Sequence, residues 1–325
     1  MPSHEEVQVY PAIYKERQSF VIENDRVRVE IVPDIGGKIV SLVYKPSGKE
    51  WLLDSGSRPF VQPFYGSAFT DWDMSGWDEC FPTINACTVR ANEHVAVQLP
   101  DHGEVWSLPW NCETQDQSVV CSVSGIGLPY RLTRTISFLT TGHVRLAYKV
   151  DNLGGDQLPF LWTAHPQFSI SEPTQIVLPD SMRNMLCVYG GRKLQIGEEY
   201  DVSSYLNIQP EPIADGKKFY YPGVVPAGWS GLYGRESGNY LRVSVDVHKV
   251  PYLGIWIDEG KYNDRVTCAL EPGIGYYDSL EMALINGTSV VIESSKSHEW
   301  HLDLELGQGS LENAYSRVND IETRK

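Results

Sequence analysis

Two histidines of the sequence stand where an apparent strand gives way to turn residues, a placement that suits acid–base chemistry. His102 precedes Gly103, and His165 ends an apolar run and precedes Pro166. Taken singly, a histidine in such a position is more often structural than catalytic. Histidine nevertheless changes charge near neutral pH, so a partner carboxylate would complete the minimum set of groups for proton transfer.

The candidate partner is Glu271, which follows the five strand-type residues 266–270 and precedes Pro272 and Gly273. Proline restricts the preceding residue to an extended backbone, and glycine permits a sharp turn. We therefore expect Glu271 to be held rigidly at a strand end, as a base within about 3 Å of its proton must be. We expect His102, His165 and Glu271 to converge on one pocket.

The stretch FTDWDMSGWDECFPTINAC, residues 69–87, mixes acids and aromatics. Asp71 and Asp73 resemble the start of a calcium loop, but Pro82 stands where the bidentate glutamate belongs. We favour a sugar-binding loop, since small-ligand pockets combine aromatic surface with a few polar groups. The alternative is an irregular loop around a buried tryptophan.

In the sugar-binding interpretation, Trp72 or Trp77 stacks on the apolar face of a pyranose, and Asp78 or Glu79 accepts hydrogen bonds from sugar hydroxyls. Neither a C-x-x-C nor an H-x-x-x-H pattern accompanies the candidate site residues, and no glycine-rich phosphate loop precedes a helix. We therefore expect no metal and no cofactor.

The elements that must position these residues are predominantly strands. Short segments of β-branched and aromatic residues alternate with polar ones and are separated by Gly, Pro, Asn and Asp, a pattern typical of antiparallel sheets. The segments are VRVEIVP, GKIVSLVY, HVAVQL, SVVCSVSG, RLTRTISFL, HVRLAYKV, LRVSVDVH, SVVIES and HEWHLDLEL. The sequence predicts an all-β fold, a large antiparallel β-sandwich in which residues 1–325 form one domain. We expect a polar amino-terminal segment at about 1–19 and a carboxyl-terminal tail at about 308–325 with some helical character.

The composition of the chain limits the classes of molecule that it can bind. The chain has 325 residues, of which 42% are hydrophobic and 21% charged, with a net charge of −15. Such a charge repels nucleic acids and anionic membranes, so a neutral small molecule, here a sugar, is the expected partner. No secretory signal or membrane span is apparent. We expect a cytoplasmic protein, monomeric or homodimeric, whose six cysteines are free thiols.

Five motifs resemble those of the aldose 1-epimerases, the galactose mutarotase-like family. They are GGKIVSLVY, the His-Gly pair at 102–103, AHPQF, GIWID and CALEPGIGYYDSL, and together they cover roughly residues 20–305. The resemblance implies a galactose mutarotase-like β-sandwich. It also implies that His165 is the general acid, Glu271 the general base and His102 the second histidine of the site.

The chain departs from the usual family pattern around its middle histidine. The family reads Asn-His-Thr-Tyr or Asn-His-Ser-Tyr, whereas here Thr163-Ala164 precede His165 and Pro166 follows it. This resembles divergent branches that include hexose-phosphate epimerase relatives. Those relatives often carry an arginine three residues after the His-Gly pair. Trp106 stands there instead, so we expect an aromatic contact with substrate and not a phosphate contact.

The function implied is a cofactor-free epimerase that interconverts the anomers of an aldose by acid–base ring opening. Two alternatives remain open, because one fold can support many functions. The chain could be a non-catalytic carbohydrate-binding or sensor protein, or an isomerase of a modified hexose. The identity of the sugar is not apparent from the sequence.

Overall fold

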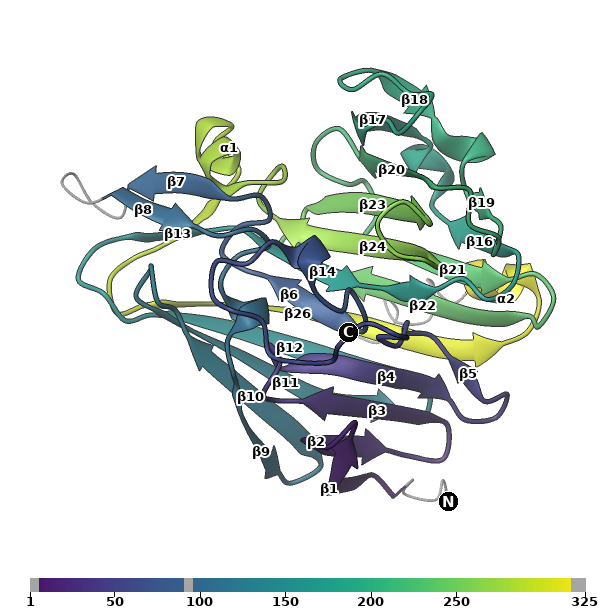
Figure 1. Cartoon of the computed structure of the whole chain (residues 1–325), viewed down its shortest axis with the longest axis horizontal. Helices are drawn as coiled ribbons and strands as arrows, with labels where there is room; N and C mark the ends of the chain where they lie inside the picture. Colours follow the sequence, from purple (N-terminus) through teal and green to yellow (C-terminus); the bar gives the residue numbers. More distant parts are fainter. Residues whose placement is uncertain (1–5, 91–95, 317–325) are drawn as a thin grey trace.

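The chain forms two large antiparallel β-sheets that stack on one another (Figure 1). The computed structural model describes residues 6–90 and 96–316. The larger sheet has the strand order β1 (Gln8–Tyr14), β2 (Arg17–Glu23), β3 (Val27–Val32), β4 (Lys38–Tyr44), β6 (Trp77–Cys80), β14 (Trp162–Pro166), β24 (Val266–Ile274), β23 (Tyr252–Glu259), β20 (Asp215–Tyr220), β17 (Asn184–Tyr189) and β18 (Glu199–Asp201). Two short strands extend it, β5 (Lys49–Glu50) beside β4 and β15 (Phe168–Ser169) beside β24.

The second sheet follows the order β19 (Asn207–Ile208), β16 (Thr174–Val177), β21 (Trp229–Gly234), β22 (Asn239–Val245), β26 (Ser297–Gln308), β12 (His143–Asn152), β11 (Tyr130–Thr140), β10 (Ser118–Ser124) and β9 (Asn111–Gln115). Two small two-stranded sheets, β7 (Cys87–Arg90) with β8 (Ala96–Leu99) and β13 (Leu158–Phe160) with β25 (Val290–Ile292), complete the strands of the described residues. The predicted antiparallel β-sandwich is confirmed.

Helices are few and short among the described residues. They are α1 (Leu280–Ile285) and α2 (Leu311–Ser316), with 3-10 turns η1 (Phe69–Asp71), η2 (Val105–Ser107), η3 (Asp180–Met182) and η4 (Val202–Ser204). Helix α1 was not predicted from the sequence; the Ser279 side chain caps its amino terminus by accepting a hydrogen bond from the Met282 amide. Neither helix is long and apolar enough to cross a membrane.

The chain ends differ in part from the prediction. Within the amino-terminal segment expected to be only polar, β1 pairs with β2 along their whole length and forms the edge of the larger sheet. Helix α2 lies in the carboxyl-terminal tail, as the helical pattern there predicts. Residues 1–5 and 317–325 of these two segments lie outside the described part of the chain, as do the first two residues of HVAVQL.

A buried ion pair joins the two sheets across the hydrophobic core. Glu79 of β6 accepts a hydrogen bond from Arg134 Nη1 of β11 at 3.0 Å, and both side chains are fully buried. The Tyr148 hydroxyl donates to the same carboxylate at 2.8 Å, and the Trp162 indole donates at 2.9 Å. Burial raises the pKa of Glu79, an effect that Arg134 and the two other donors oppose. A buried charge is tolerated only when it is paired in this way.

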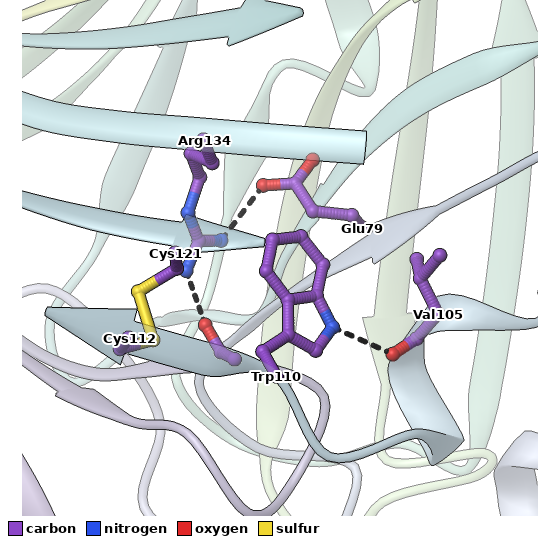
Figure 2. Close-up of a disulfide and its surroundings, with 7 residues drawn as sticks. Glu79, Val105, Trp110, Cys112, Cys121 and Arg134 are labelled. Atoms are coloured by element: carbon purple, nitrogen blue, oxygen red, sulfur yellow. Dashed lines mark hydrogen bonds and ion pairs between the residues drawn. A yellow bond between two sulfur atoms is a disulfide. The ribbon is translucent and has the colours of Figure 1, made fainter. Parts of the chain in front are cut away.

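Beside this ion pair the structure contains a disulfide between Cys112 and Cys121 (Figure 2). The expectation of six free thiols is therefore wrong for this pair, while the other four cysteines are free. Cys112 of β9 lies directly opposite Cys121 of β10, and their Cα atoms are 4.1 Å apart. The pairing depends on the hairpin register, which a search for short cysteine motifs does not detect. Trp110 lies just before Cys112, and its ring lies under the Arg134 guanidinium (Figure 2).

We expect Arg134→Met to lower the free energy of unfolding by about 3–5 kcal/mol, because it leaves the buried Glu79 carboxylate without its cation. Arg131→Met is the matched control: Arg131 lies on the same strand but is exposed, so its loss should change stability by no more than about 0.5 kcal/mol. Urea unfolding followed by tryptophan fluorescence measures both. Equal stability of the two variants would show that the ion pair does not hold the sheets together.

Candidate active site

A cavity of about 330 Å³ opens on the face of the larger sheet that points away from the second sheet. This volume lies at the lower end of the range for small-molecule pockets. Its lining combines aromatic, acidic and basic side chains. They are Phe69, Thr70, Met74, Ile84, Asn85, Asp101, His102, His165, Gln167, Val188, Tyr189, Lys218, Trp256, Tyr262, Glu271 and Asp278. His102, His165 and Glu271 thus lie at the same cavity.

Strand register explains why residues distant in sequence share this face. His165 lies opposite Asp78 in the pairing of β14 with β6, and Thr163 lies opposite Gly273 in the pairing of β14 with β24. Directly opposed residues of neighbouring strands project to the same side, as do residues two apart on one strand. Glu271, two residues before Gly273, therefore shares the face of His165.

Glu271 lies at the buried floor of the cavity between two nitrogen donors. Its Oε1 is 3.2 Å from His165 Nδ1, and its Oε2 is 3.1 Å from Lys218 Nζ. Burial alone would raise the pKa of Glu271, but the charge of Lys218 and the hydrogen bond with His165 outweigh it and lower the pKa to about 2. Glu271 is therefore a carboxylate throughout the physiological pH range.

The backbone that carries Glu271 is a continuous strand and not the predicted turn. Strand β24 continues through Pro272 and Gly273 to Ile274, with Glu271 opposite Gly254 of β23. Gly273 serves close packing, since a Cβ there would come within 2.8 Å of the Thr163 hydroxyl. The carboxylate is held by paired strands on both sides, which immobilise it more firmly than a strand end would.

His165 is buried and contacts a polar residue with each ring nitrogen. Nδ1 faces Glu271, and Nε2 lies 3.2 Å from the amide nitrogen of Gln167. The Gln167 carbonyl oxygen accepts from the Thr267 hydroxyl at 3.2 Å, which orients the amide so that its nitrogen donates to Nε2. Burial lowers the pKa of His165, and Glu271 offsets this only in part. The imidazole is thus neutral at pH 7, with its proton on Nδ1.

His102 reaches the cavity because of an uncommon backbone conformation. Its φ is +58°, and the following Gly103 has φ +76°. A Cβ at Gly103 would lie 2.2 Å from the Phe81 carbonyl oxygen, so only glycine fits beside this histidine. The His102 ring stacks on Phe69 with centroids 4.3 Å apart, and its Nδ1 is 2.9 Å from Asp101 Oδ1. These contacts direct the ring toward His165, 5.0 Å away between centroids.

Lys218 and Asp278 are site residues that the sequence analysis did not identify. Lys218 Nζ binds Asp278 Oδ1 at 2.7 Å as well as Glu271, and Tyr220 donates to the same Asp278 oxygen at 2.8 Å. Burial lowers the pKa of Lys218, but Asp278 and Glu271 together raise it well above its usual value. Lys218 is therefore a fixed cation behind the carboxylate. Asp278 lies within the CALEPGIGYYDSL motif, whereas the KKFYY stretch around Lys218 carries no comparable signal.

An aromatic wall lines the cavity at a place that the sequence analysis did not assign. Trp256 packs against Tyr189 and Tyr262, with centroids 5.4 and 5.7 Å away. Trp256 lies opposite Lys218 in the pairing of β20 with β23, which puts its ring on the cavity face. The GIWID motif contains this tryptophan, so attention to its strand parity could have identified it.

The tryptophans proposed for sugar stacking do not line the cavity. Trp77 is fully buried in the core. Trp106 is also buried, and together with the half-buried Trp72 it packs against Phe69 and Met74 behind the cavity wall. Phe69 itself lines the cavity. Trp72 and Trp106 therefore pack behind the cavity wall and do not contact a ligand inside the cavity.

The acids proposed for hydroxyl recognition are also buried outside the cavity lining, because Trp77–Cys80 form strand β6 and not a loop. Successive strand residues face opposite sides, so Glu79 enters the core while Asp78 points to the other face. There the Lys38 ammonium binds Asp78 at 2.9 Å and Asp73 at 2.8 Å. Asp73, considered above for a calcium loop, is thus paired with a lysine. Burial raises the pKa of Asp78 to about 6 in spite of Lys38.

Several solved structures share this fold. The Slr1438 protein of Synechocystis sp. PCC 6803 superposes with a TM-score of 0.69 and 17% identity over 94% of this chain and 97% of that one. Galactose mutarotase-like proteins of Lactobacillus casei (TM-score 0.65, 16% identity, 89% and 100% covered) and Clostridium acetobutylicum (0.67, 15%, 94% and 99%) are similar. At these identities the likeness establishes the fold.

The sequence carries the family signal in its own right. The model of the aldose 1-epimerase family matches residues 18–215, well over half of the chain and inclusive of both cavity histidines. No curated protein matches the chain significantly. On the family match, supported by the shared sandwich fold, the chain belongs to the aldose 1-epimerase family.

Proposed function

We propose that the protein is a cofactor-free epimerase that interconverts the α and β anomers of an aldose. The observation that carries this proposal is the contact between His165 Nδ1 and Glu271 Oε1, 3.2 Å apart at the floor of a sugar-sized cavity. A hydrogen-bonded acid and base can act together on the hydroxyl oxygen and the ring oxygen, which are both bonded to C1 of the sugar. The family match supports the same reaction.

In the proposed mechanism, Glu271 removes the proton from the C1 hydroxyl while protonated His165 delivers a proton through Nε2 to the ring oxygen. The bond between C1 and the ring oxygen breaks, and the C1 oxygen becomes the aldehyde. Rotation about the C1–C2 bond and the reverse proton transfers close the ring on the other face. Both residues recover their starting protonation, and the reaction requires neither a metal nor a redox cofactor.

The remaining cavity residues fit supporting roles. His102, held by Asp101 and Phe69, would hydrogen-bond the ring oxygen or a neighbouring hydroxyl. Trp256 offers a flat aromatic surface for the apolar face of a pyranose. Lys218 keeps Glu271 ionised, but it also makes the Glu271 carboxylate a weaker base. Structures with this fold include galactose mutarotase-like proteins, so galactose and glucose are the first sugars to assay.

A sugar sensor is the second candidate, and one observation favours it. The pKa of Glu271, about 2, makes this carboxylate a weak base, as suits a structural ion pair. A sensor would retain the cavity and the aromatic wall while exchanging no anomers. Catalysis and binding must therefore be measured side by side.

We expect Glu271→Gln and His165→Asn each to slow anomer exchange by about 10²–10⁴, because each keeps the shape of the side chain and removes its proton function. Sugar affinity should change far less. His301→Asn, a histidine on β26 outside the cavity, is the control and should keep full activity. Saturation transfer between the anomeric protons measures exchange, and calorimetry measures affinity. If the wild type binds the sugar tightly but exchanges its anomers no faster than buffer does, the enzyme proposal fails and the sensor proposal takes its place.

The pH dependence follows from the two pKa shifts. Glu271 stays ionised down to about pH 2, whereas the pKa of His165 is lowered, so its acid form becomes scarcer as the pH rises. We expect kcat/KM to fall about tenfold per pH unit above the pKa of His165 and to increase from pH 8 toward pH 5. Polarimetry across that range measures it, with His165→Asn as the variant that loses the dependence. A rate that rises toward alkaline pH would contradict the acid role of His165.

Trp256→Ala should weaken sugar binding about tenfold, or ~1.4 kcal/mol, because it removes the proposed stacking surface. Exchange of the sugar that still binds should continue at a similar kcat. Trp229→Ala removes a half-buried tryptophan of the second sheet and should leave affinity unchanged. Calorimetric titration compares the three proteins; an unaltered dissociation constant for Trp256→Ala would exclude Trp256 as the platform.

A further inference from the structure

A buried cysteine lies behind the two cavity histidines and has no part in the proposed reaction. Cys80 Sγ, one ring nitrogen of His102 and one of His165 all lie within 4.8 Å of one another. Cys80 is a free thiol at the end of β6, opposite Thr163, so it projects to the same face as His165. Strands β6 and β14 and the loop before η2 thus bring one sulfur and two imidazoles together.

The outer contacts of both histidines match those of metal ligands. Nδ1 of His102 is 2.9 Å from the Asp101 carboxylate, and Nδ1 of His165 is 3.2 Å from the Glu271 carboxylate. Metal-ligating histidines almost always use one ring nitrogen for such a carboxylate or carbonyl partner, which fixes the tautomer and strengthens the other nitrogen as a ligand. In each ring Nε2 is the nitrogen left for a ligand.

The donor set and the local charge favour a soft or borderline cation. One thiolate with two imidazoles suits Zn²⁺ or Cu⁺ more than Mg²⁺ or Ca²⁺. Zinc–ligand bonds of about 2.0–2.3 Å put neighbouring ligand atoms about 3.3–3.6 Å apart. Atoms that lie within 4.8 Å of one another must therefore approach by up to about 1.5 Å. The Asp101 and Glu271 carboxylates, which contact His102 and His165, lie beside these ligands and add negative charge that attracts a cation.

We propose that Cys80, His102 and His165 form a binding site for one Zn²⁺ ion or a metal of similar preference, with the fourth position open to the cavity. Binding replaces the Cys80 thiol proton by the metal and releases that proton to solvent. The contact between Gln167 and His165 Nε2 is given up in exchange for the metal bond. The site follows from the geometry of the three ligands and does not depend on the proposed reaction.

One consequence does rest on the proposed function. Metal binding engages both histidines, so zinc and sugar compete, and zinc acts as a reversible inhibitor of anomer exchange. Chelation then leaves the rate unchanged or raises it. Zinc in this site has no catalytic role, in contrast to the open zinc sites of hydrolases.

The test is titration of the apo protein with Co²⁺, whose spectrum reports its ligands, followed by displacement with Zn²⁺. The wild type should bind one equivalent and show a sulfur-to-cobalt charge-transfer band in the near ultraviolet. Cys80→Ser should abolish that band and weaken Zn²⁺ binding by about 100-fold or more; Asp101→Asn, which removes only the outer carboxylate, should weaken it about 10- to 100-fold. Cys87→Ser is the matched control, since Cys87 is a free thiol outside the trio.

Each outcome decides for or against the site. A charge-transfer band in the wild type and Cys87→Ser that is lost in Cys80→Ser supports it. Circular dichroism of each variant without metal shows that the fold is retained, and Asp101→Asn supplies an answer if Cys80→Ser does not fold. No stoichiometric binding by the wild type overturns the proposal, as does a band that survives Cys80→Ser or Zn²⁺ affinity unchanged by Asp101→Asn. None of these results requires epimerase activity, so the failure of one proposal is distinguishable from the failure of the other.

Discussion

The buried ion pair between Glu79 and Arg134 is the interaction on which the arrangement of the site depends. It connects β6 of the larger sheet with β11 of the second sheet, and both side chains are fully buried. Tyr148 and Trp162 donate two further hydrogen bonds to the Glu79 carboxylate. Such a pair contributes little net stability relative to apolar packing, yet loss of one partner is costly. Its main effect here is to specify which face of β6 is inside. Because side chains alternate along a strand, an inward Glu79 forces Asp78 and Cys80 to the cavity face.

On that outer face, charge is organised by two lysines that are each shared by two carboxylates. Lys38 binds Asp73 and Asp78, and Lys218 binds Glu271 and Asp278. Each cluster carries one excess negative charge, which keeps both lysines cationic and holds the strands and loops around the cavity in place. Each lysine lowers the pKa of the carboxylate it binds, but burial outweighs this effect at Asp78 and not at Glu271. The pKa of Glu271 is lowered to about 2, whereas that of Asp78 rises to about 6.

The same rigidity creates two competing uses for the histidines. As a proton-transfer pair with Glu271, His165 needs Nε2 free for a sugar oxygen. As a metal ligand, it offers the same nitrogen to a cation shared with His102 and Cys80. Both uses rely on carboxylates that hold Nδ1 of the two rings. A fixed pair of imidazoles beside a buried thiol is therefore consistent with both proposals, the epimerase reaction and the binding of a soft metal.

Much of this protein was determined by local sequence. Alternating residues indicated the β-sandwich, and strands such as β11, β12 and β26 lie where the pattern predicted them. Short motifs indicated the family and pointed to His102, His165 and Glu271. These features could be predicted because period-two alternation and turn residues act over a few neighbours along the chain.

Tertiary structure alone decided which side of each strand faces the cavity and which distant residues meet there. It moved Trp77 into the core, put Trp256 at the cavity wall, brought Lys218 to Glu271 and paired Cys112 with Cys121. Each of these depends on the register between strands that can be far apart in sequence. A shift of one residue sends every side chain of a strand to the opposite face, and the local pattern along one strand does not specify the register of its neighbour.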